Sequence, residues 1–246
     1  MNIIVSLTSH TKERLKYVGQ NLYLSFLKNN INVKIVLTLY KDDIKFIPND
    51  LQELIDNKIV ELIIADKNLG SHLKYFYCMK KYRNASIITI DDDSVYPKEM
   101  IPDFIKNLKI HPNTILCRCA RIINPNVSYQ HWFDCVSGLI KVKWHGCKNE
   151  IRQDLSPLGY AGICYPANIL NVNDDMIIDI NKTLHADDIF LSVIEQKKKI
   201  NIMLVGYNYN KLDKSEKGFD AISSKINKNS HTEYIDNYLK EKGIIK

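Results

Sequence analysis

The sequence has little glycine, with 9 glycines in 246 residues, and none of them forms a phosphate-binding loop behind the first predicted strand. The segment at that place reads LTSHTKERLK, residues 7–16. Dinucleotide-binding and P-loop proteins need closely spaced glycines there, so that backbone N–H groups can approach phosphate. Those two kinds of site are therefore excluded. No apolar run approaches the roughly 20 residues that a membrane-spanning helix needs.

Cysteine pairs and long basic tracts are also missing. The 6 cysteines contain no CxxC pair, so we expect reduced, buried thiols rather than zinc sites or disulfides. The N-terminus has no basic leader before its apolar run, and we expect a cytoplasmic protein. The net charge of +6 suits anionic small molecules and peripheral contact with the inner face of a membrane. The longest basic tract, residues 197–199, is too short to indicate nucleic-acid binding.

Apolar runs alternate with helical patterns over the first 123 residues. Such alternation predicts an α/β fold with a mostly parallel, Rossmann-like sheet and helices on both faces. Ligands of such sheets bind beyond the carboxyl ends of the strands. The predicted strands span residues 2–8, 33–39, 58–66, 85–90 and 114–120, and the predicted helices span residues 15–26, 50–57, 71–82 and 97–110.

The second half of the chain has a less regular pattern. No internal repeat and no Pro- or Ser-rich linker divides it from the first half, so we expect a single domain over residues 1–246. The predicted elements are a helix at 185–199, a strand at 200–206, a polar and mobile segment at 207–229 and a closing helix at 230–243.

Three adjacent carboxylates follow the fourth predicted strand, in the stretch IITIDDDSVYP at residues 87–97. One aspartate there would only cap the next helix, but three like charges side by side repel one another. A divalent cation with oxygen ligands, Mn²⁺ or Mg²⁺, removes that repulsion. Asp91 and Asp93 are separated by one residue, which lets both serve one cation in a partly extended chain. The pattern therefore favours a metal site at the end of this strand.

Two classes of enzyme carry such an acidic motif after a strand. The DDDSV stretch satisfies the D-x-D-x-[TV] pattern of haloacid-dehalogenase-type phosphatases, and Asp187 and Asp188 could supply their second acidic pair. In those enzymes, however, the nucleophilic aspartate ends the first strand, and here three strands precede it. The D-x-D motif of nucleotide-sugar transferases instead holds a cation that stabilises the leaving diphosphate.

Four stretches in the same order resemble a bacterial family of GT-A glycosyltransferases from capsule and lipopolysaccharide clusters, related to the large inverting glycosyltransferase family. They are IIVSLTSHTKERL at 3–15, LGSHLKYFYCMKKYRNASIITIDDDSVYP at 69–97, SPLGYAGICYP at 156–166 and ADDIFL at 186–191. The third stretch departs from the family pattern at Ala161, where a second glycine is usual. The resemblance implies the GT-A (nucleotide-diphospho-sugar transferase) fold, with a nucleotide-sugar-binding half at 1–123 and an acceptor-binding half at 124–246.

The resemblance also implies a nucleotide-diphosphate sugar donor, which we expect to be a UDP-sugar. Six residues would then face the donor and its Mn²⁺ or Mg²⁺. They are Thr8 and Ser9 near the nucleoside, Lys74 near the phosphates, Asp91 and Asp92 near ribose and metal, and Asp93 as the direct metal ligand.

Inverting transfer needs a carboxylate that takes the proton from the attacking hydroxyl. The resemblance places it in the acidic pair that opens the late helix, with Asp188 as the base and Asp187 as the second candidate. His231 is a further candidate metal ligand, because some GT-A enzymes complete the metal site with a C-terminal histidine; an ordinary surface histidine is the alternative.

The expected function is therefore transfer of a sugar to a saccharide or lipid-linked saccharide acceptor in bacterial surface polysaccharide synthesis. Two other functions stay open. A sugar nucleotidyltransferase shares the sheet and the metal acid, although the segment LTSHTKERLK lacks the Gly-rich basic signature of such enzymes. A non-catalytic nucleotide- or carbohydrate-binding protein would share the fold without requiring both acidic clusters.

Overall fold

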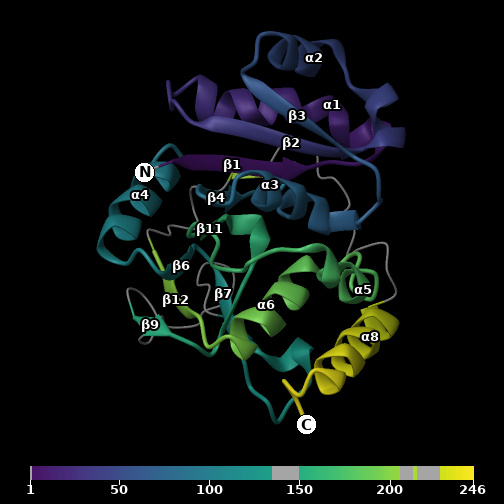
Figure 1. Ribbon diagram of the computed structural model, residues 1–246, viewed down its shortest axis with the longest axis vertical. Helices are drawn as coiled ribbons and strands as arrows, with labels where there is room; N and C mark the ends of the chain where they lie inside the picture. Colours follow the sequence, from purple (N-terminus) through teal and green to yellow (C-terminus); the bar gives the residue numbers. More distant parts are fainter. Residues whose placement is uncertain (1, 135–149, 206–212, 215–227) are drawn as a thin grey trace.

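The centre of the molecule is an eight-stranded sheet with the strand order β3-β2-β1-β4-β11-β6-β12-β9 (Figure 1). The structure is a computed structural model that describes residues 2–134, 150–205, 213–214 and 228–246. Strands β1 to β4 pair in parallel, as do β6 and β12, whereas β11 lies antiparallel between β4 and β6. The strands of this sheet are β1 (Ile3–Thr8), β2 (Lys34–Tyr40), β3 (Val60–Ala65), β4 (Ser86–Thr89), β6 (Thr114–Cys117), β9 (Ile151–Arg152), β11 (Ile163–Tyr165) and β12 (Asn201–Leu204).

Two smaller sheets and the helices complete the described chain. One small sheet has the order β10-β7-β8 and the other pairs β13 with β5. These strands are β5 (Ser94–Val95), β7 (Ala120–Ile122), β8 (Phe133–Asp134), β10 (Leu155–Pro157) and β13 (Asp213–Lys214). The α-helices are α1 (Thr11–Leu22), α2 (Asn49–Asp56), α3 (Phe76–Lys81), α4 (Met100–Ile110), α5 (Ile177–Ile180), α6 (Asp187–Lys197) and α8 (Lys228–Glu241).

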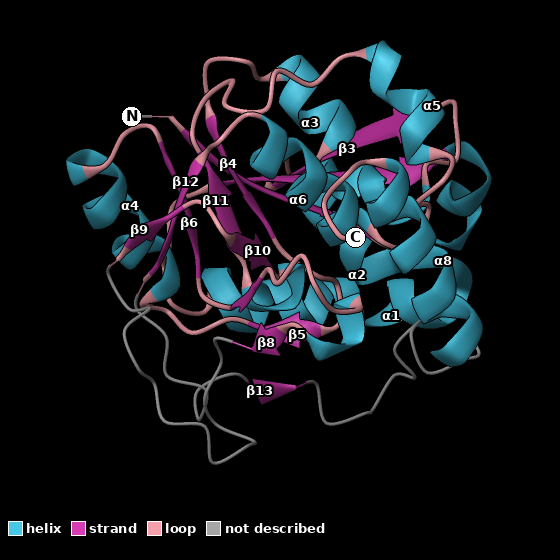
Figure 2. Cartoon of the chain, turned by 90° about the horizontal axis from the view of Figure 1, so that it is seen from below, coloured by secondary structure: helices cyan, strands magenta, loops and turns pink. Residues whose placement is uncertain are grey.

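Helices cover both faces of the central sheet (Figure 2). Alternate side chains of a strand point to opposite faces, so β1 contributes to two cores. Val5 and Leu7 pack in the core that α1, α2 and α4 cover. Ile4 points to the other face, where it packs in a smaller core with Cys78 of α3. The core under α6 and α8 contains Ile189. The predicted mostly parallel sheet with helices on both faces is therefore confirmed.

Two predicted elements are wrong in detail. The predicted helix at 71–82 is a 3₁₀ segment, Gly70–Lys74, followed by the short helix α3. Hydrogen bonds from this segment to residues 183 and 184 hold it in place, so tertiary contacts override the helical pattern. The predicted strand at 114–120 is two strands, β6 and β7, which belong to different sheets. The predicted mobile segment, 207–229, lies almost wholly outside the described residues.

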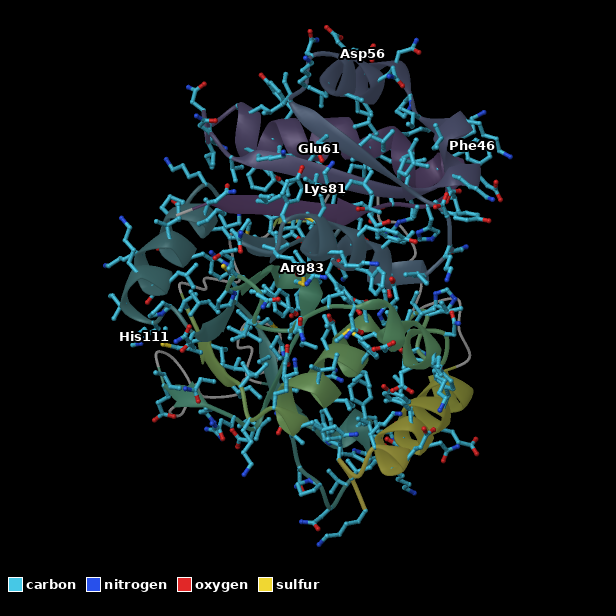
Figure 3. All side chains as sticks on the ribbon, viewed as in Figure 1. Phe46, Asp56, Glu61, Lys81, Arg83 and His111 are labelled. Atoms are coloured by element: carbon cyan, nitrogen blue, oxygen red, sulfur yellow. The ribbon has the colours of Figure 1, made fainter. Side chains whose placement is uncertain are left out.

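An exposed ion network joins the outer strands to α3. The Glu61 carboxylate of β3 accepts hydrogen bonds from Lys81 and Tyr82 and forms an ion pair with Lys34 of β2. Glu61 and Lys81 are labelled in Figure 3. Because its lysines are exposed, this network provides a reference for the buried lysine described below. In the part of the chain that the structure covers, no helix is both long enough and apolar enough to cross a membrane.

Candidate functional site

The carboxyl ends of β1 and β4 meet at one edge of the central sheet, because the two strands pair in parallel. A cavity of about 270 Å³ opens at this edge. Its wall therefore combines residues that follow β1, residues that follow β4 and the beginning of α6. The lining residues are Thr8, Ser9, His10, Arg14, Asp43, Asn68, Gly70, Ser71, Leu73, Lys74, Ile90, Asp91, Asp92, Asp93, His185 and Asp187.

Asp92 is the most enclosed of the three adjacent aspartates, with 5% of its surface exposed. Its carboxylate accepts hydrogen bonds from the Ser9 hydroxyl at 2.5 Å and from both the Nε and an Nη of Arg14. The Asn21 amide donates to the Asp92 backbone carbonyl at 2.8 Å. The side chain is therefore a counter-ion for Arg14, and it retains room for one further donor at most.

Lys74 connects the two acidic clusters, which lie almost a hundred residues apart in the sequence. Its Nζ lies 2.9 Å from Asp91 Oδ1 and 2.8 Å from Asp187 Oδ2, and the residue is 7% exposed. Burial disfavours the charged amine, but the carboxylates of Asp187 and Asp91 outweigh it and hold the pKa of Lys74 well above its usual value. Lys74 is therefore a buried cation shared by both clusters.

Asp188 follows Asp187 at the start of α6 but lies outside the cavity lining. Its Oδ2 accepts a hydrogen bond from the Gly159 backbone N–H at 3.0 Å, and its buried Oδ1 has no hydrogen-bond partner among the described residues. Burial and the neighbouring Asp187 raise the pKa of Asp188 to about 7. This carboxyl group can therefore exchange a proton near neutral pH.

The loop of Gly159 is held against both clusters. A Cβ at Gly159 would lie 2.8 Å from Lys74 Nζ and 2.9 Å from Asp188 Oδ1, so a side chain there would displace one or both of these groups. On the other side, the Asp91 N–H donates to the Tyr96 hydroxyl, which in turn donates to the Tyr160 carbonyl. The positive φ of this loop, 92°, falls on Gly162, so the alanine at 161 needs no left-handed backbone.

Asp93 differs from its two neighbours because its ion pair is the longest of the three. Its side chain is 27% exposed, and the nearest Arg14 nitrogen lies 3.4 Å away. Burial and the charges of Asp91 and Asp92 raise the pKa of Asp93. Burial is the larger cause, but the like charges of Asp91 and Asp92 add to it, and a bound cation would offset that repulsion.

The protein offers such a cation few other ligands. No group of three or more His, Cys, Asp or Glu side chains among the described residues could hold a metal ion. The His231 side chain is absent from the cavity lining, although burial and the nearby His185, which is a lining residue, lower its pKa. Mg²⁺-type sites commonly use one or two carboxylates and complete the coordination with substrate phosphate and water. The aspartate oxygens at this edge of the sheet fit a cation of that kind.

The structure brings together most of the residues that the sequence singled out. Thr8, Ser9, Lys74, the three aspartates 91–93 and Asp187 line one cavity, Asp188 lies beside it, and His231 lies outside the lining. Sequence reasoning missed His10, Arg14 and His185. Arg14 follows the first strand by only six residues, so its place at the strand end is a signal that could have indicated it.

The comparisons with known proteins concern the fold. No family model and no curated protein matches the chain. Among solved structures, the chain is similar to S. aureus TarS 1-349 in complex with UDP-GlcNAc, with a TM-score of 0.52 and 13% identity over 91% of this chain and 61% of that one. It is also similar to a 4-diphosphocytidyl-2C-methyl-D-erythritol synthase from Anaerococcus prevotii, with a TM-score of 0.51 and 10% identity over 97% of this chain and 96% of that one.

The chain thus spans about three-fifths of the TarS structure that it matches. At these identities the likeness shows the fold alone. The molecule has a GT-A-like α/β fold with a large, mostly parallel central sheet, the arrangement found in both glycosyltransferases and nucleotidyltransferases.

Proposed function

We propose that the protein is a metal-dependent glycosyltransferase that moves a sugar from a nucleotide-diphosphate sugar to a saccharide or lipid-linked acceptor, with inversion at the anomeric carbon. The observation that carries this proposal is the position of Lys74, within 2.9 Å of Asp91 and 2.8 Å of Asp187. One buried cation thereby joins an acidic cluster suited to a metal and an acidic pair suited to a base. The resemblance to capsule and lipopolysaccharide enzymes suggests a UDP-sugar donor and a role in bacterial surface polysaccharide synthesis.

The charge of the cavity supports dependence on a divalent cation. Its acidic lining residues outnumber its lysine and arginine residues, since Asp43, Asp91, Asp92, Asp93 and Asp187 face only Arg14 and Lys74. A nucleoside diphosphate is itself an anion, so such a wall would repel it. A divalent cation bound there would remove this repulsion and neutralise the charge of the leaving diphosphate.

The residues proposed to bind the nucleotide-sugar donor lie in the wall of the same cavity. Asp93 would hold the cation, with Asp91 as the second candidate, and Lys74 would face the phosphates. Thr8 and Ser9, at the end of β1, would lie near the nucleoside. His231 lies outside the cavity lining, so its place in the metal site rests on the resemblance.

Asp188 is the proposed base. Its Oδ1 has no hydrogen-bond partner among the described residues, and a pKa of about 7 lets the carboxylate form exist at neutral pH. The acceptor hydroxyl gives its proton to Asp188 while its oxygen attacks the anomeric carbon from the face opposite the diphosphate. The bond from that carbon to the diphosphate oxygen breaks, and the electron pair leaves with the nucleoside diphosphate. Lys74 holds Asp187 ionised beside this base.

A nucleotidyltransferase is the second candidate. The structure from Anaerococcus prevotii favours it, because that likeness covers almost the full length of both chains. The segment after β1 argues against it. That segment, LTSHTKERLK, contains no glycine and so supplies no Gly-rich backbone for a triphosphate.

The two reactions leave different products, and ³¹P NMR separates them. We expect UDP to accumulate when the protein is incubated with a panel of UDP-sugars, Mn²⁺ and short saccharide acceptors, both with and without added pyrophosphate. A nucleotidyltransferase would instead convert a UDP-sugar and pyrophosphate into UTP and a sugar 1-phosphate. Binding of UDP-sugars without either product would indicate a binding protein. Formation of UTP, with no UDP in any mixture, would contradict the proposal.

A further inference from the structure

The 3₁₀ segment Gly70–Lys74 lies against the chain that enters α6. The backbone N–H of Ser71 donates to the Leu184 carbonyl at 2.9 Å, and the Ser71 hydroxyl donates to the same oxygen at 3.1 Å. Gly70 has a φ of +58°, and a Cβ there would collide with the Leu184 carbonyl oxygen. Glycine therefore permits both the backbone conformation and the close approach.

His72 makes the next connection and is completely buried. Its Nε2 lies 2.7 Å from the Thr183 carbonyl oxygen, and its Nδ1 lies 2.8 Å from the Tyr75 hydroxyl. A carbonyl oxygen only accepts hydrogen bonds, so Nε2 carries the proton and Nδ1 accepts the Tyr75 hydroxyl proton. Burial lowers the pKa of His72, in keeping with a neutral ring.

The ring also contacts α6 directly. The Phe190 ring, one turn into that helix, meets the imidazole edge-on with centroids 5.2 Å apart. Two residues beyond His72, Lys74 reaches Asp187 at 2.8 Å. The 3₁₀ segment and the start of α6 are therefore joined at three successive levels, at residues 183, 184 and 187.

We propose that His72 is a positioning residue, which holds the acidic pair that opens α6 in its place beside Lys74 through the Thr183 carbonyl and the Phe190 ring. The inference rests on the proposed function in one respect, since Asp188 is the base of that reaction. His72 is not one of the residues that line the cavity. It acts by fixing where the chain turns into α6, and so by keeping Asp188 shielded from water.

A buried histidine that only fills space in the core would have different consequences. Its loss would lower stability without changing the proton affinity of Asp188. A positioning residue must change that affinity, because the buried environment that it maintains is the main cause of the raised pKa of Asp188. The two roles can therefore be distinguished by titrating Asp188 itself, with no substrate present.

The experiment is a ¹³C NMR titration of the aspartate carboxyl groups in the full-length protein. The Asp188 signal is assigned by its disappearance in Asp188→Asn. The variants are His72→Leu, which loses both hydrogen bonds, and His72→Gln, whose amide N–H retains a donor for the Thr183 carbonyl. Phe104→Leu, a buried substitution in α4 on the opposite face of the sheet, is the matched control for general loss of stability.

We expect the midpoint of Asp188 to fall by at least about one pH unit in His72→Leu, as water reaches the carboxyl group. In His72→Gln the midpoint should return most of the way to the wild-type value, and in Phe104→Leu it should match wild type. The same order should appear in the acid limb of turnover. An unchanged Asp188 midpoint in His72→Leu, or an equal shift in Phe104→Leu, would overturn the proposal.

Tyr75→Phe covers the case in which His72→Leu does not fold. This variant removes only the hydroxyl group that donates its proton to Nδ1, and it should shift the Asp188 midpoint in the same direction by a smaller amount; no shift would count against the proposal. The titration needs no substrate, so its outcome does not depend on transferase activity. If the Asp188 midpoint falls in His72→Leu as expected but the protein transfers no sugar, the proposed function is refuted and the placement of α6 by His72 still stands.

Discussion

The two acidic clusters of the cavity are made of the same side chain, but their surroundings differ. In the cluster after β4, Arg14 forms its closest ion pair with Asp92 and Lys74 pairs with Asp91, so that Asp93 has the longest ion pair of the three, 3.4 Å to Arg14. In the cluster at the start of α6, Lys74 covers Asp187, while the one hydrogen bond that the described residues donate to the Asp188 side chain comes from a backbone N–H. Neighbouring charge and burial therefore decide which carboxylate suits a cation and which suits a proton.

The largest expected effect is a loss of turnover in Asp188→Asn, which removes the proton-accepting carboxylate. The asparagine keeps the size of the side chain but cannot accept a proton. General-base catalysis is typically worth about 10²–10⁴-fold, so the barrier should rise by roughly 3–5 kcal/mol. In wild type, turnover should rise with pH through about 7, the pKa of Asp188, because only the ionised form is a base. Initial rates from pH 5.5 to 9 measure both effects.

Asp187→Asn is the control for that experiment. It weakens the contact to Lys74 but leaves Asp188 able to accept a proton, so it should retain more activity than Asp188→Asn. The inverting mechanism would be refuted if both variants transferred sugar at the wild-type rate. If only Asp187→Asn were inactive, the role of base would move to Asp187.

The next largest effect is expected on stability in Lys74→Met. Removing one partner of a buried ion pair leaves the other charge uncompensated, which typically costs about 3–5 kcal/mol. Here Asp91 and Asp187 both lose their partner. The free energy of unfolding in urea should fall by that order, and affinity for a nucleoside diphosphate should fall more than affinity for the nucleoside.

Lys81→Met is the matched control for Lys74→Met. Lys81 also pairs with a carboxylate, Glu61, at 2.9 Å, but its side chain is 54% exposed. Exposed pairs contribute about 0–1 kcal/mol, so this variant should remain within about 1 kcal/mol of wild type. Equal losses of unfolding free energy in the two variants would show that burial does not make the ion pairs of Lys74 more stabilising than the exposed pair of Lys81.

A smaller effect is expected in Asp93→Asn, which sharpens the contrast between Asp93 and its covered neighbours. Burial and the charges of Asp91 and Asp92 raise the pKa of Asp93, so its ionised form costs stability at neutral pH. Without ligands the variant should be at least as stable as wild type. Added Mn²⁺ and UDP at 100 times their dissociation constant should stabilise wild type by about 2.7 kcal/mol, and this gain should fall by at least about half in the variant. Thermal unfolding of wild type and variant, with and without both ligands, tests these two expectations.

The smallest effect concerns Glu195, a completely buried acid in α6 whose two carboxylate oxygens have no hydrogen-bond partner among the described residues. Burial and Asp188 raise the pKa of Glu195 well above its usual value. The folded state then binds the proton more tightly than the unfolded state, so stability falls as the pH rises above about 4.3, the pKa of an unfolded glutamate. Glu195→Gln cannot ionise. Its stability relative to wild type should therefore be greater at pH 8 than at pH 5, by urea unfolding, while exposed Glu53→Gln should show no such change.

Much of the fold could be predicted from the sequence, because each strand of the parallel sheet is a short apolar run that ends in polar residues. The strand ends then indicated the edge where Thr8 and the aspartates 91–93 meet. What could not be predicted depends on contacts between distant residues. The helical spacing of residues 71–82 gave no sign that Gly70–Lys74 would dock on residues 183 and 184.

The same limit applies to the candidate site. The residue types of Asp91, Asp92 and Asp93 are identical, so no local pattern tells which of them Arg14 covers. Likewise, the pair Asp187 and Asp188 reads as two ordinary acids at a helix start. The raised pKa of Asp188 arises from burial and from Asp187 together, and the burial exists only in the folded chain.

Calorimetric titration of UDP in the presence of Mn²⁺, carried out side by side on wild type, Asp93→Asn and Asp188→Asn, tests most directly whether the two clusters have different roles. We predict that Asp188→Asn binds UDP as tightly as wild type, and that Asp93→Asn binds it at least about 10-fold more weakly, a difference of about 1.4 kcal/mol. Excess chelator should weaken the wild type to the same degree. Wild-type affinity in Asp93→Asn, or loss of affinity in Asp188→Asn, would contradict the division between a cation-binding and a proton-accepting cluster.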